Sequence, residues 1–136
     1  MNSMSEAPQS LLRYELYRGS KLAVRRSRLH RWGVFALETI RRYELLEEAP
    51  YFAVAKEELT GSPICEAYSY WLSDDTSLLA MGCAGLYNHS FEPNADFELD
   101  RINEVIRHYA LRDIEAGEEL TLDYGEENAG RFLQAA

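Results

Sequence analysis

Two polar segments in the C-terminal half carry side chains that could serve a chemical reaction. The first spans residues 88–94 (NHSFEPN), where two asparagines, a histidine and a serine surround one proline between apolar stretches. Asparagine, serine and proline are common turn residues, so composition alone favours a polar turn. Polar side chains in a crowded turn nevertheless need partners, and the donor and acceptor edges of a purine ring are suitable ones. The segment is therefore either a turn or part of a site for an adenine-containing ligand.

The second segment, residues 117–125 (GEELTLDYG), lies further along the chain and places Tyr124 next to a glycine. A tyrosine at a strand end is more often a half-buried aromatic than a catalyst. A phenol held in a fixed position can, however, orient a reacting amine through its hydroxyl. The acids Glu118, Glu119 and Asp123 have the pattern of solvated or structural carboxylates, and we assign them no catalytic role.

In this order and near this separation, the two segments resemble the two signature segments of the SET domain, the fold of S-adenosylmethionine-dependent protein lysine methyltransferases. The Asn-His-Ser-x-x-Pro-Asn element of that family is matched at every fixed position. The resemblance implies that S-adenosylmethionine is the cofactor. It implies that Asn88 and His89 bind this cofactor, mostly through backbone groups plus the Asn88 amide, and that Tyr124 is the catalytic tyrosine beside it.

Methyl transfer from a sulfonium to a lysine is an in-line displacement in which the attacking amine must be neutral. The pKa of an unperturbed lysine is about 10.4, so a neutral amine at pH 7 costs about 4–5 kcal/mol. Desolvation in an apolar, aromatic channel lowers that pKa, and so does the positive charge of the sulfonium. Such a site therefore needs aromatic walls and positioned hydroxyls, and we do not expect Tyr124 to be a general base.

A third element lies upstream, in residues 30–36 (HRWGVFA). It resembles the Gly-x-Gly segment whose backbone holds the methionine part of the cofactor, with Arg31 in place of the first glycine and with Trp32 and Gly33 fitting the pattern. Without the resemblance, the segment is a turn entering a strand. If Arg31 must adopt a positive φ, its backbone is strained; otherwise its backbone groups suffice. Trp32 either borders the cofactor pocket or is an ordinary surface or core aromatic.

Aromatic walls for a lysine channel are offered by residues 67–71 (AYSYW), although core packing is an ordinary use for these side chains. The resemblance implies an active-site tyrosine here, with Tyr68 as the first choice and Tyr70 as the second. Two further positions in the family set how many methyl groups fit, and here they hold Phe97 and Leu122. Neither has a hydroxyl that would retain a water molecule, so we expect room for di- or trimethylation.

The C-terminal end offers Phe132, which could stack on the adenine as C-terminal aromatics do in the family, or could belong to a frayed terminus. Many nuclear members close this end with a cysteine-rich zinc segment. This chain has only Cys65 and Cys83 and lacks the short Cys/His spacings of a zinc site, so we expect no metal and two reduced, packed thiols. Phe132 or a partner subunit would then cover the site.

Length and charge narrow the class of protein. The 136 residues suit one domain, which we place at residues 14–136 after a flexible tail at residues 1–13. The net charge of −9 argues against nucleic acid or an anionic membrane as partner. It suits a basic protein substrate with a lysine-containing tail, although solubility alone would also explain it. A compact viral family member works as a homodimer, so a homodimer is a further expectation.

Localisation follows from the absence of two patterns in the printed sequence. No apolar run approaches the ~20 residues that span a bilayer. The N-terminus shows no basic stretch followed by an apolar one, so it does not have the pattern of a secretory signal. We therefore expect an intracellular, cytoplasmic protein.

Short strands dominate the predicted elements, which gives a mainly β (β-rich α+β) fold class. Alternating or apolar runs predict strands at 22–25, 33–36, 45–49, 51–54, 96–100, 105–111 and 120–122. Pro50 is expected to end one strand. Ser62-Pro63 predicts the start of a helix that covers about residues 64–72. The SET resemblance implies small sheets around a C-terminal pseudoknot with one or two short helices.

Two rival interpretations remain at this point. The chain could be a SET-like module that binds a peptide or the cofactor without turnover, and Arg31 is the feature in favour of it. It could also be a β-rich interaction module that resembles the family by chance. The intact segment around Asn88 and the intact Tyr124 favour the enzyme.

Overall fold

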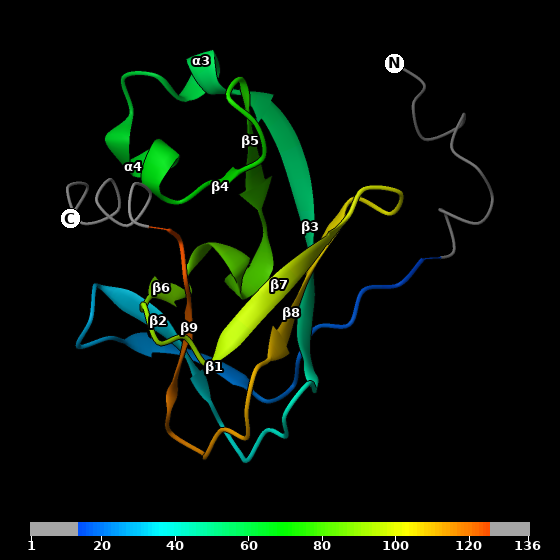
Figure 1. Cartoon of the computed structure of the whole chain (residues 1–136), viewed down its shortest axis with the longest axis vertical. Helices are drawn as coiled ribbons and strands as arrows, with labels where there is room; N and C mark the ends of the chain where they lie inside the picture. Colours follow the sequence, from blue (N-terminus) through cyan, green and yellow to red (C-terminus); the bar gives the residue numbers. More distant parts are fainter. Residues whose placement is uncertain (1–13, 126–136) are drawn as a thin grey trace.

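The strands form two sheets in the computed structural model, which describes residues 14–125 (Figure 1). The smaller sheet has the order β1-β2-β9-β6. Its members are β1 (Leu22–Arg26), β2 (Trp32–Ala36), β9 (Glu119–Leu122) and β6 (Asn88–His89). The pair β6 and β9 is parallel, with Asn88 opposite Thr121 and His89 opposite Leu122. The two signature segments, distant in sequence, are therefore neighbouring strands of one sheet.

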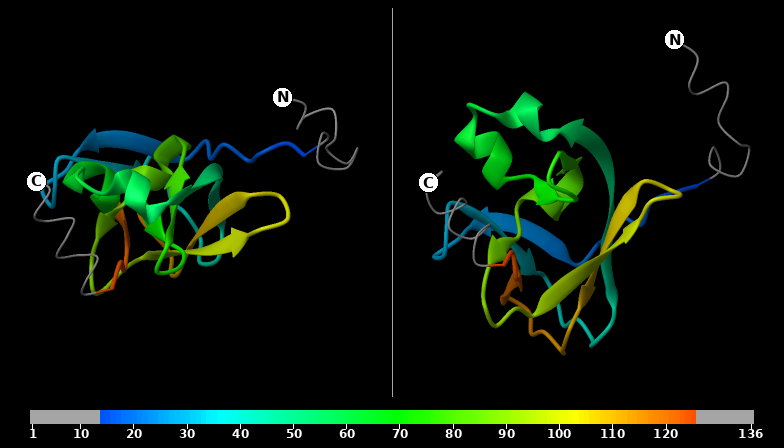
Figure 2. Two further views of the ribbon diagram at one scale, coloured as in Figure 1. Left: turned by 90° about the horizontal axis from the view of Figure 1, so that it is seen from above. Right: turned by 45° about the horizontal axis from the view of Figure 1, so that its top comes forward.

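The larger sheet is antiparallel, with the order β4-β5-β3-β8-β7. Its members are β4 (Tyr70–Trp71), β5 (Thr76–Ala80), β3 (Leu45–Ala55), β8 (Val105–Ala110) and β7 (Ala95–Asp100). The tip of the β7–β8 hairpin projects from the rest of the molecule (Figure 2). Together the strands confirm the predicted β-rich class with few short helices.

Strand β3 continues through Pro50, so the prediction that this residue ends a strand is wrong. Residues 45–50 of β3 pair with β8, whereas residues 51–55 pair with β5. Pro50 thus lies where the strand changes partner, and its carbonyl accepts the Met81 N–H at 2.9 Å. A proline is tolerated there because only one of the two ladders passes through it.

The predicted helix at 64–72 is correct only in its first half. The helix α4 covers Pro63–Ala67, and the Ser62 side chain caps its start by accepting the Cys65 N–H. Tyr70 and Trp71 instead form β4 against β5. A five-residue helix gains little from propensity, so pairing with an existing strand decides the conformation of the next residues. The other helical elements within residues 14–125 are α3 (Lys56–Leu59) and η1 (Gly82–Gly85).

The main core lies between the two sheets and contains Val34, Ala36, Ile40, Leu46, Tyr87, Ala95, Ala110, Ile114, Leu120 and Leu122. A smaller cluster of Tyr51, Leu78 and Ile106 lies within the larger sheet. Tyr70 and Phe97 pack against both clusters. Of the two cysteines, Cys83 is half-buried but Cys65 is exposed, so the prediction of a packed thiol is wrong for Cys65.

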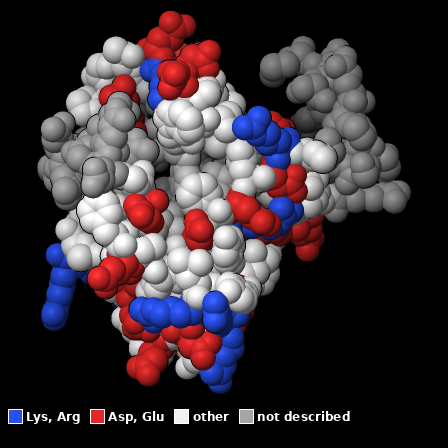
Figure 3. Space-filling view, viewed as in Figure 1, with Lys and Arg blue, Asp and Glu red and all other residues white. Residues whose placement is uncertain are grey.

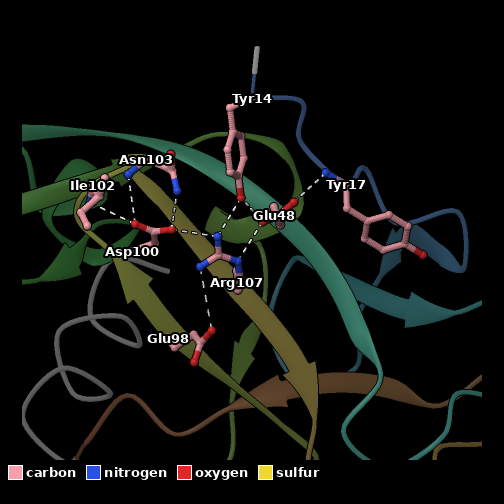
Figure 4. Close-up of polar contacts among 8 residues, drawn as sticks. All are labelled: Tyr14, Tyr17, Glu48, Glu98, Asp100, Ile102, Asn103 and Arg107. Carbon is pink, nitrogen blue, oxygen red and sulfur yellow. Dashed lines mark hydrogen bonds and ion pairs between the residues drawn. The ribbon is translucent and has the colours of Figure 1, made fainter. Parts of the chain in front are cut away.

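Arg107 of β8 ties the segment before β1 to the larger sheet (Figure 4). Its guanidinium contacts Glu48 and Asp100 at 2.8 Å each and donates to the Tyr14 hydroxyl at 2.7 Å. Tyr14 also donates to Glu48, and the Tyr17 N–H donates to the same carboxylate. The start of the described chain is thereby anchored across β3, β7 and β8. No helix within residues 14–125 combines the length and apolar character needed to cross a membrane.

Candidate active site

A cavity of about 220 Å³ opens between the two sheets beside α4. Its lining includes Tyr68, Tyr70, Phe97, Leu122 and Tyr124. These are the five residues that the sequence assigns to catalysis and to the substrate pocket. The structure brings all five to one cavity, and the role of each of them stays a prediction.

Four separate segments supply these walls. Tyr68 is the C-cap of α4, and Tyr70 follows in β4. Phe97 lies in β7, and Leu122 is the last residue of β9. Neither Tyr68 nor Trp71 lies within the helix, which has ended before both. Only the tertiary fold places these aromatic side chains around one space.

Tyr124 is held at both ends. Its N–H donates to His89 Nδ1 at 3.0 Å, and its hydroxyl donates to the carbonyl of Tyr87. Burial is the first cause that raises the pKa of this phenol, and the nearby Tyr68 and Glu119 raise it further. Tyr124 therefore keeps its proton at neutral pH, which agrees with a positioning hydroxyl and not with a phenolate base.

His89 is oriented by that same bond. An imidazole nitrogen that accepts an N–H carries no proton, so Nδ1 is the acceptor, and neutral His89 has its proton on Nε2. The ring also packs edge-on against Phe91 at 4.2 Å between centroids. His89 thus connects β6 to the turn that carries Tyr124.

Tyr70 has the most enclosed hydroxyl of the tyrosines in the cavity wall. It lies 2.6 Å from the carbonyl oxygen of Ala84 and 2.8 Å from Nε2 of His108. Burial raises the pKa of this phenol well above its ordinary value. His108 was not predicted as a site residue. Its sequence signal is a histidine that alternates with Ile106 and Ala110 on the inward face of a strand.

The upstream loop contains Arg31, whose backbone strain is one of the two alternatives that the sequence leaves open. Arg31 has a φ of +41°, in the left-handed region that residues with a side chain rarely adopt. Trp32 is 45% exposed and lies under the Arg26 guanidinium, 4.1 Å from its ring centre. Gly33 is buried, and a Cβ at this position would clash with the Glu119 carboxylate. The loop is therefore closely packed at Gly33 and open at Trp32.

Asn88 fastens this loop to the signature strands. Its amide nitrogen lies 3.1 Å from the carbonyl oxygen of His30, 2.9 Å from that of Trp32 and 2.7 Å from Glu119 Oε2. Its Oδ1 is buried and has no hydrogen-bond partner within residues 14–125. Glu119 also accepts from the Ser27 hydroxyl at 2.6 Å, which makes it a structural acid, as expected.

Asn94 closes the motif on the other signature segment. Its side-chain amide donates to the Glu119 carbonyl at 2.8 Å, and its oxygen accepts the Thr121 N–H at 2.9 Å. Residues 88–94 therefore hold β9 by β6 pairing at one end and by a buried amide at the other. The predicted pseudoknot stays a prediction.

The loop residues fit the methyl donor that the resemblance implies. S-adenosylmethionine has amine donors, and the buried Asn88 oxygen is an acceptor left without a partner among the described residues. Gly33 brings the loop backbone close to this side chain, because a Cβ there would meet the Glu119 carboxylate and the Asn88 amide nitrogen. Phe132, predicted to stack on the adenine, lies outside the described residues. Within the described range 14–125, no three His, Cys, Asp or Glu side chains are grouped as a metal would need.

Comparison with known proteins agrees with this geometry. The SET domain family matches residues 31–125. A histone-lysine N-methyltransferase specific for H3 lysine-37 from Schizosaccharomyces pombe is 34% identical over 110 residues, covering 79% of this chain and 75% of the relative. One specific for H3 lysine-4 from Saccharomyces cerevisiae is 32% identical over 111 residues, covering 73% of this chain and 10% of the relative.

A solved structure of a Plasmodium falciparum protein, described as a candidate histone methyltransferase, has a TM-score of 0.65 at 32% identity and covers 78% of this chain and 98% of its own. The fold is thus that of a SET domain. The chain belongs to the SET domain family. It spans about three quarters of the fission yeast relative but only about a tenth of the budding yeast one.

Proposed function

We propose that the protein is a lysine methyltransferase that transfers a methyl group from S-adenosylmethionine to a basic, histone-like protein. The observation that carries this proposal is the cavity, where three tyrosines and two apolar side chains from four segments meet. Family membership and histone-lysine methyltransferase relatives support the same reaction.

The cavity walls favour a neutral lysine amine. Tyr68, Tyr70, Phe97 and Leu122 surround the space with mostly apolar surface, so an entering ammonium loses water and its pKa falls. The bound cofactor supplies an electrophilic methyl group on a positively charged sulfur. The Tyr124 hydroxyl donates its proton to the Tyr87 carbonyl, so toward an amine N–H its oxygen acts as an acceptor. Tyr124 then aligns the amine without taking its proton.

The cofactor would be held by the loop residues Arg31, Trp32 and Gly33 together with the signature strand. Asn88 keeps this loop in place through its amide hydrogens and has an acceptor oxygen left over. His89 fixes the backbone of Tyr124, the residue shared between the cofactor and the lysine. These contacts support one continuous site that extends from the loop to the cavity.

Transfer of methyl groups to histones tests this proposal. We would incubate the purified protein with S-adenosylmethionine and recombinant core histones. Mass spectrometry then measures the intact mass of each histone. The proposal predicts a mass increase of one or more methyl groups on lysine, reduced at least about tenfold in rate by Tyr124→Phe. Absence of any methylated histone would contradict the histone-like substrate, and a full rate in Tyr124→Phe would contradict the mechanism.

A second candidate function is binding without turnover. The strained Arg31 backbone in the cofactor loop favours it, because strain there could displace the methyl donor from the cavity. Cofactor binding with no transfer to any basic protein would support this alternative.

Partner and location follow from the main proposal. A basic tail is its substrate, and a second copy of the chain could close the site as a homodimer. An intracellular location, cytoplasmic as predicted from the sequence, belongs to the same proposal. Sedimentation of the purified protein would test the dimer.

A further inference from the structure

His108 lies behind the cavity wall and does not line the cavity itself. It is fully buried in β8. Buried histidines need partners, because their ring nitrogens are costly to desolvate. The neighbours of this one are the residues that shape the proposed lysine site.

The hydrogen bonds around Tyr70 show which atoms carry the phenol proton and the imidazole proton. A carbonyl can only accept, so at 2.6 Å the Tyr70 hydroxyl donates its single proton to the Ala84 oxygen. Nε2 of His108, 2.8 Å from the same hydroxyl oxygen, must then be the donor. His108 is therefore the Nε2–H tautomer. Its Nδ1 is a buried acceptor without a partner in the described part of the chain.

Two residues of the cavity wall contact this ring, and a third is linked to it through Tyr87. Tyr70 is bonded to it, and Phe97 lies directly across from His108 in the β7–β8 register with ring centres 5.9 Å apart. Tyr87 stacks on it, with centroids 4.6 Å apart and planes 4° from parallel. The Tyr87 carbonyl is the acceptor for Tyr124. His108 thus supports two walls directly and a third through one residue.

The ring stays neutral over the working pH range. Burial lowers the pKa of His108 to about 3. A neutral imidazole with one N–H gives the same hydrogen-bond pattern from pH 5 to 9, so its bond to Tyr70 does not switch with pH.

We propose that His108 is a positioning residue that makes Tyr70 a hydrogen-bond acceptor toward the substrate amine. This inference rests on the proposed lysine methyltransferase function. The Tyr70 proton is committed to Ala84 and one lone pair to His108, so what remains is a lone pair. That lone pair can accept an N–H of lysine but the phenol cannot donate to the amine lone pair that attacks the methyl group. The Ala84 carbonyl thereby keeps the phenol proton away from the nucleophilic lone pair of lysine, and His108 fixes the phenol oxygen in the orientation that this requires.

The test is a double-mutant cycle on methyl transfer. His108→Leu removes the donor at similar volume, His108→Gln retains an N–H donor, and Tyr70→Phe removes the hydroxyl. The proposal predicts that His108→Leu lowers kcat about tenfold with KM within about twofold, and that His108→Gln recovers most of it. Adding His108→Leu to Tyr70→Phe should change kcat less than twofold, because the hydroxyl through which His108 acts is already absent. Additive losses, or an unchanged kcat in His108→Leu, would overturn the proposal.

A second readout does not need activity. Nitrogen-15 NMR of the histidine rings should show His108 as the Nε2–H tautomer from pH 5 to 9, with an Nε2 proton that shifts in Tyr70→Phe. An Nδ1–H tautomer, or no shift in Tyr70→Phe, would overturn the proposal even if the enzyme is active. A protein that transfers no methyl group but shows this tautomer and shift would instead contradict the proposed function and leave the hydrogen bond established. Tyr70→Phe keeps His108 in place, so the test holds if His108→Leu does not fold.

Discussion

At the scale of single residues, the Asn88 side chain uses its amide hydrogens to bind other parts of the protein. Its amide hydrogens are used by the His30 and Trp32 carbonyls and by Glu119, which leaves its oxygen as the acceptor for a ligand. The resemblance implied that its amide binds the cofactor. Cofactor binding by Asn88 stays a prediction, and the geometry shows a second role for this side chain, which is to hold the loop that carries Arg31.

Glu47 is a buried carboxylate that should make stability depend on pH. It is 4% exposed, and burial raises its pKa from 4.5 to about 7. The folded state therefore binds the proton more tightly than the unfolded state, and stability falls as pH rises from about 4.5 to about 7. Glu47→Gln should raise the unfolding free energy by roughly 1–3 kcal/mol at pH 8, with a much smaller gain at pH 5.

Urea unfolding of both proteins at the two pH values measures this difference. Glu58→Gln, the same change on the exposed side of α3, should stay within about 0.5 kcal/mol of the wild type at both. An equal gain for Glu47→Gln at pH 5 and pH 8 would show that Glu47 does not titrate in this range.

The positive φ at Arg31 predicts that a glycine variant at this position is more stable than an alanine variant. A residue with a Cβ costs about 1–2 kcal/mol in the left-handed region, whereas glycine loses about 0.5–1 kcal/mol through the entropy of the unfolded chain. Arg31→Gly should therefore be about 0.5–1 kcal/mol more stable than Arg31→Ala, since both lack the guanidinium and differ only in the backbone. Thermal unfolding compares the pair, and an alanine variant of equal or greater stability would argue against the strain.

Phe97 and Leu122 predict the extent of methylation. Both are apolar and both line the cavity, so neither can hold a water molecule that would occupy the space of added methyl groups. Mass spectrometry at long reaction times should show di- or trimethyl-lysine. Introducing a hydroxyl with Phe97→Tyr should shift the product toward monomethyl-lysine, and a wild type that stops at one methyl group would refute the prediction.

At the scale of elements, the two signature segments are held together by backbone pairing and by two buried asparagines, Asn88 and Asn94. Asn94 accepts the Thr121 N–H and donates to the Glu119 carbonyl, and it is 4% exposed. Asn94→Ala leaves two buried backbone groups of β9 without a partner, which should lower stability by about 2–4 kcal/mol. Asn103→Ala, in the turn at the tip of the β7–β8 hairpin, should cost less than half as much. Similar losses in both variants would show that Asn94 is not a special contact.

The strands and the motif residues could be predicted from sequence, whereas their tertiary partners could not. Period-2 alternation locates β7 and β8 because one face of each is buried. The segment containing Tyr70 was misassigned to a helix because β4 has only two residues, too few to show a period-2 pattern, and its pairing with β5 sets its conformation. His108 and Glu47 were missed as polar residues on inward faces, where only the neighbours across the core decide whether such a side chain is satisfied.

At the scale of the whole molecule, charge is unevenly distributed. Residues 16–37 carry six of the fourteen basic side chains and none of the twenty-three acidic ones, so the rest of the chain is strongly acidic. On the face shown in Figure 3, acidic side chains are spread from one end of the molecule to the other. This distribution supports attraction of a basic tail and leaves the hairpin of β1 and β2 positively charged.

Electrostatic attraction predicts that substrate capture depends on salt. For a basic histone tail, kcat/KM should fall several-fold between 50 and 500 mM NaCl, whereas kcat at saturating substrate should change little. A lysine peptide without other positive charges is the control and should show a weaker dependence. If kcat/KM for the basic tail does not depend on salt, the acidic surface does not contribute to substrate capture.

We infer that the loop at residues 31–33, the Asn88 side chain and the cavity form one site for S-adenosylmethionine. Calorimetric titration of the cofactor into the wild type, Asn88→Ala and Asn103→Ala tests it directly, with circular dichroism to show that each protein is folded. We expect the wild type and Asn103→Ala to bind the cofactor saturably, and Asn88→Ala to bind it at least about tenfold more weakly. A folded wild type that takes up no cofactor, or an Asn88→Ala variant that binds as tightly as the wild type, would contradict it.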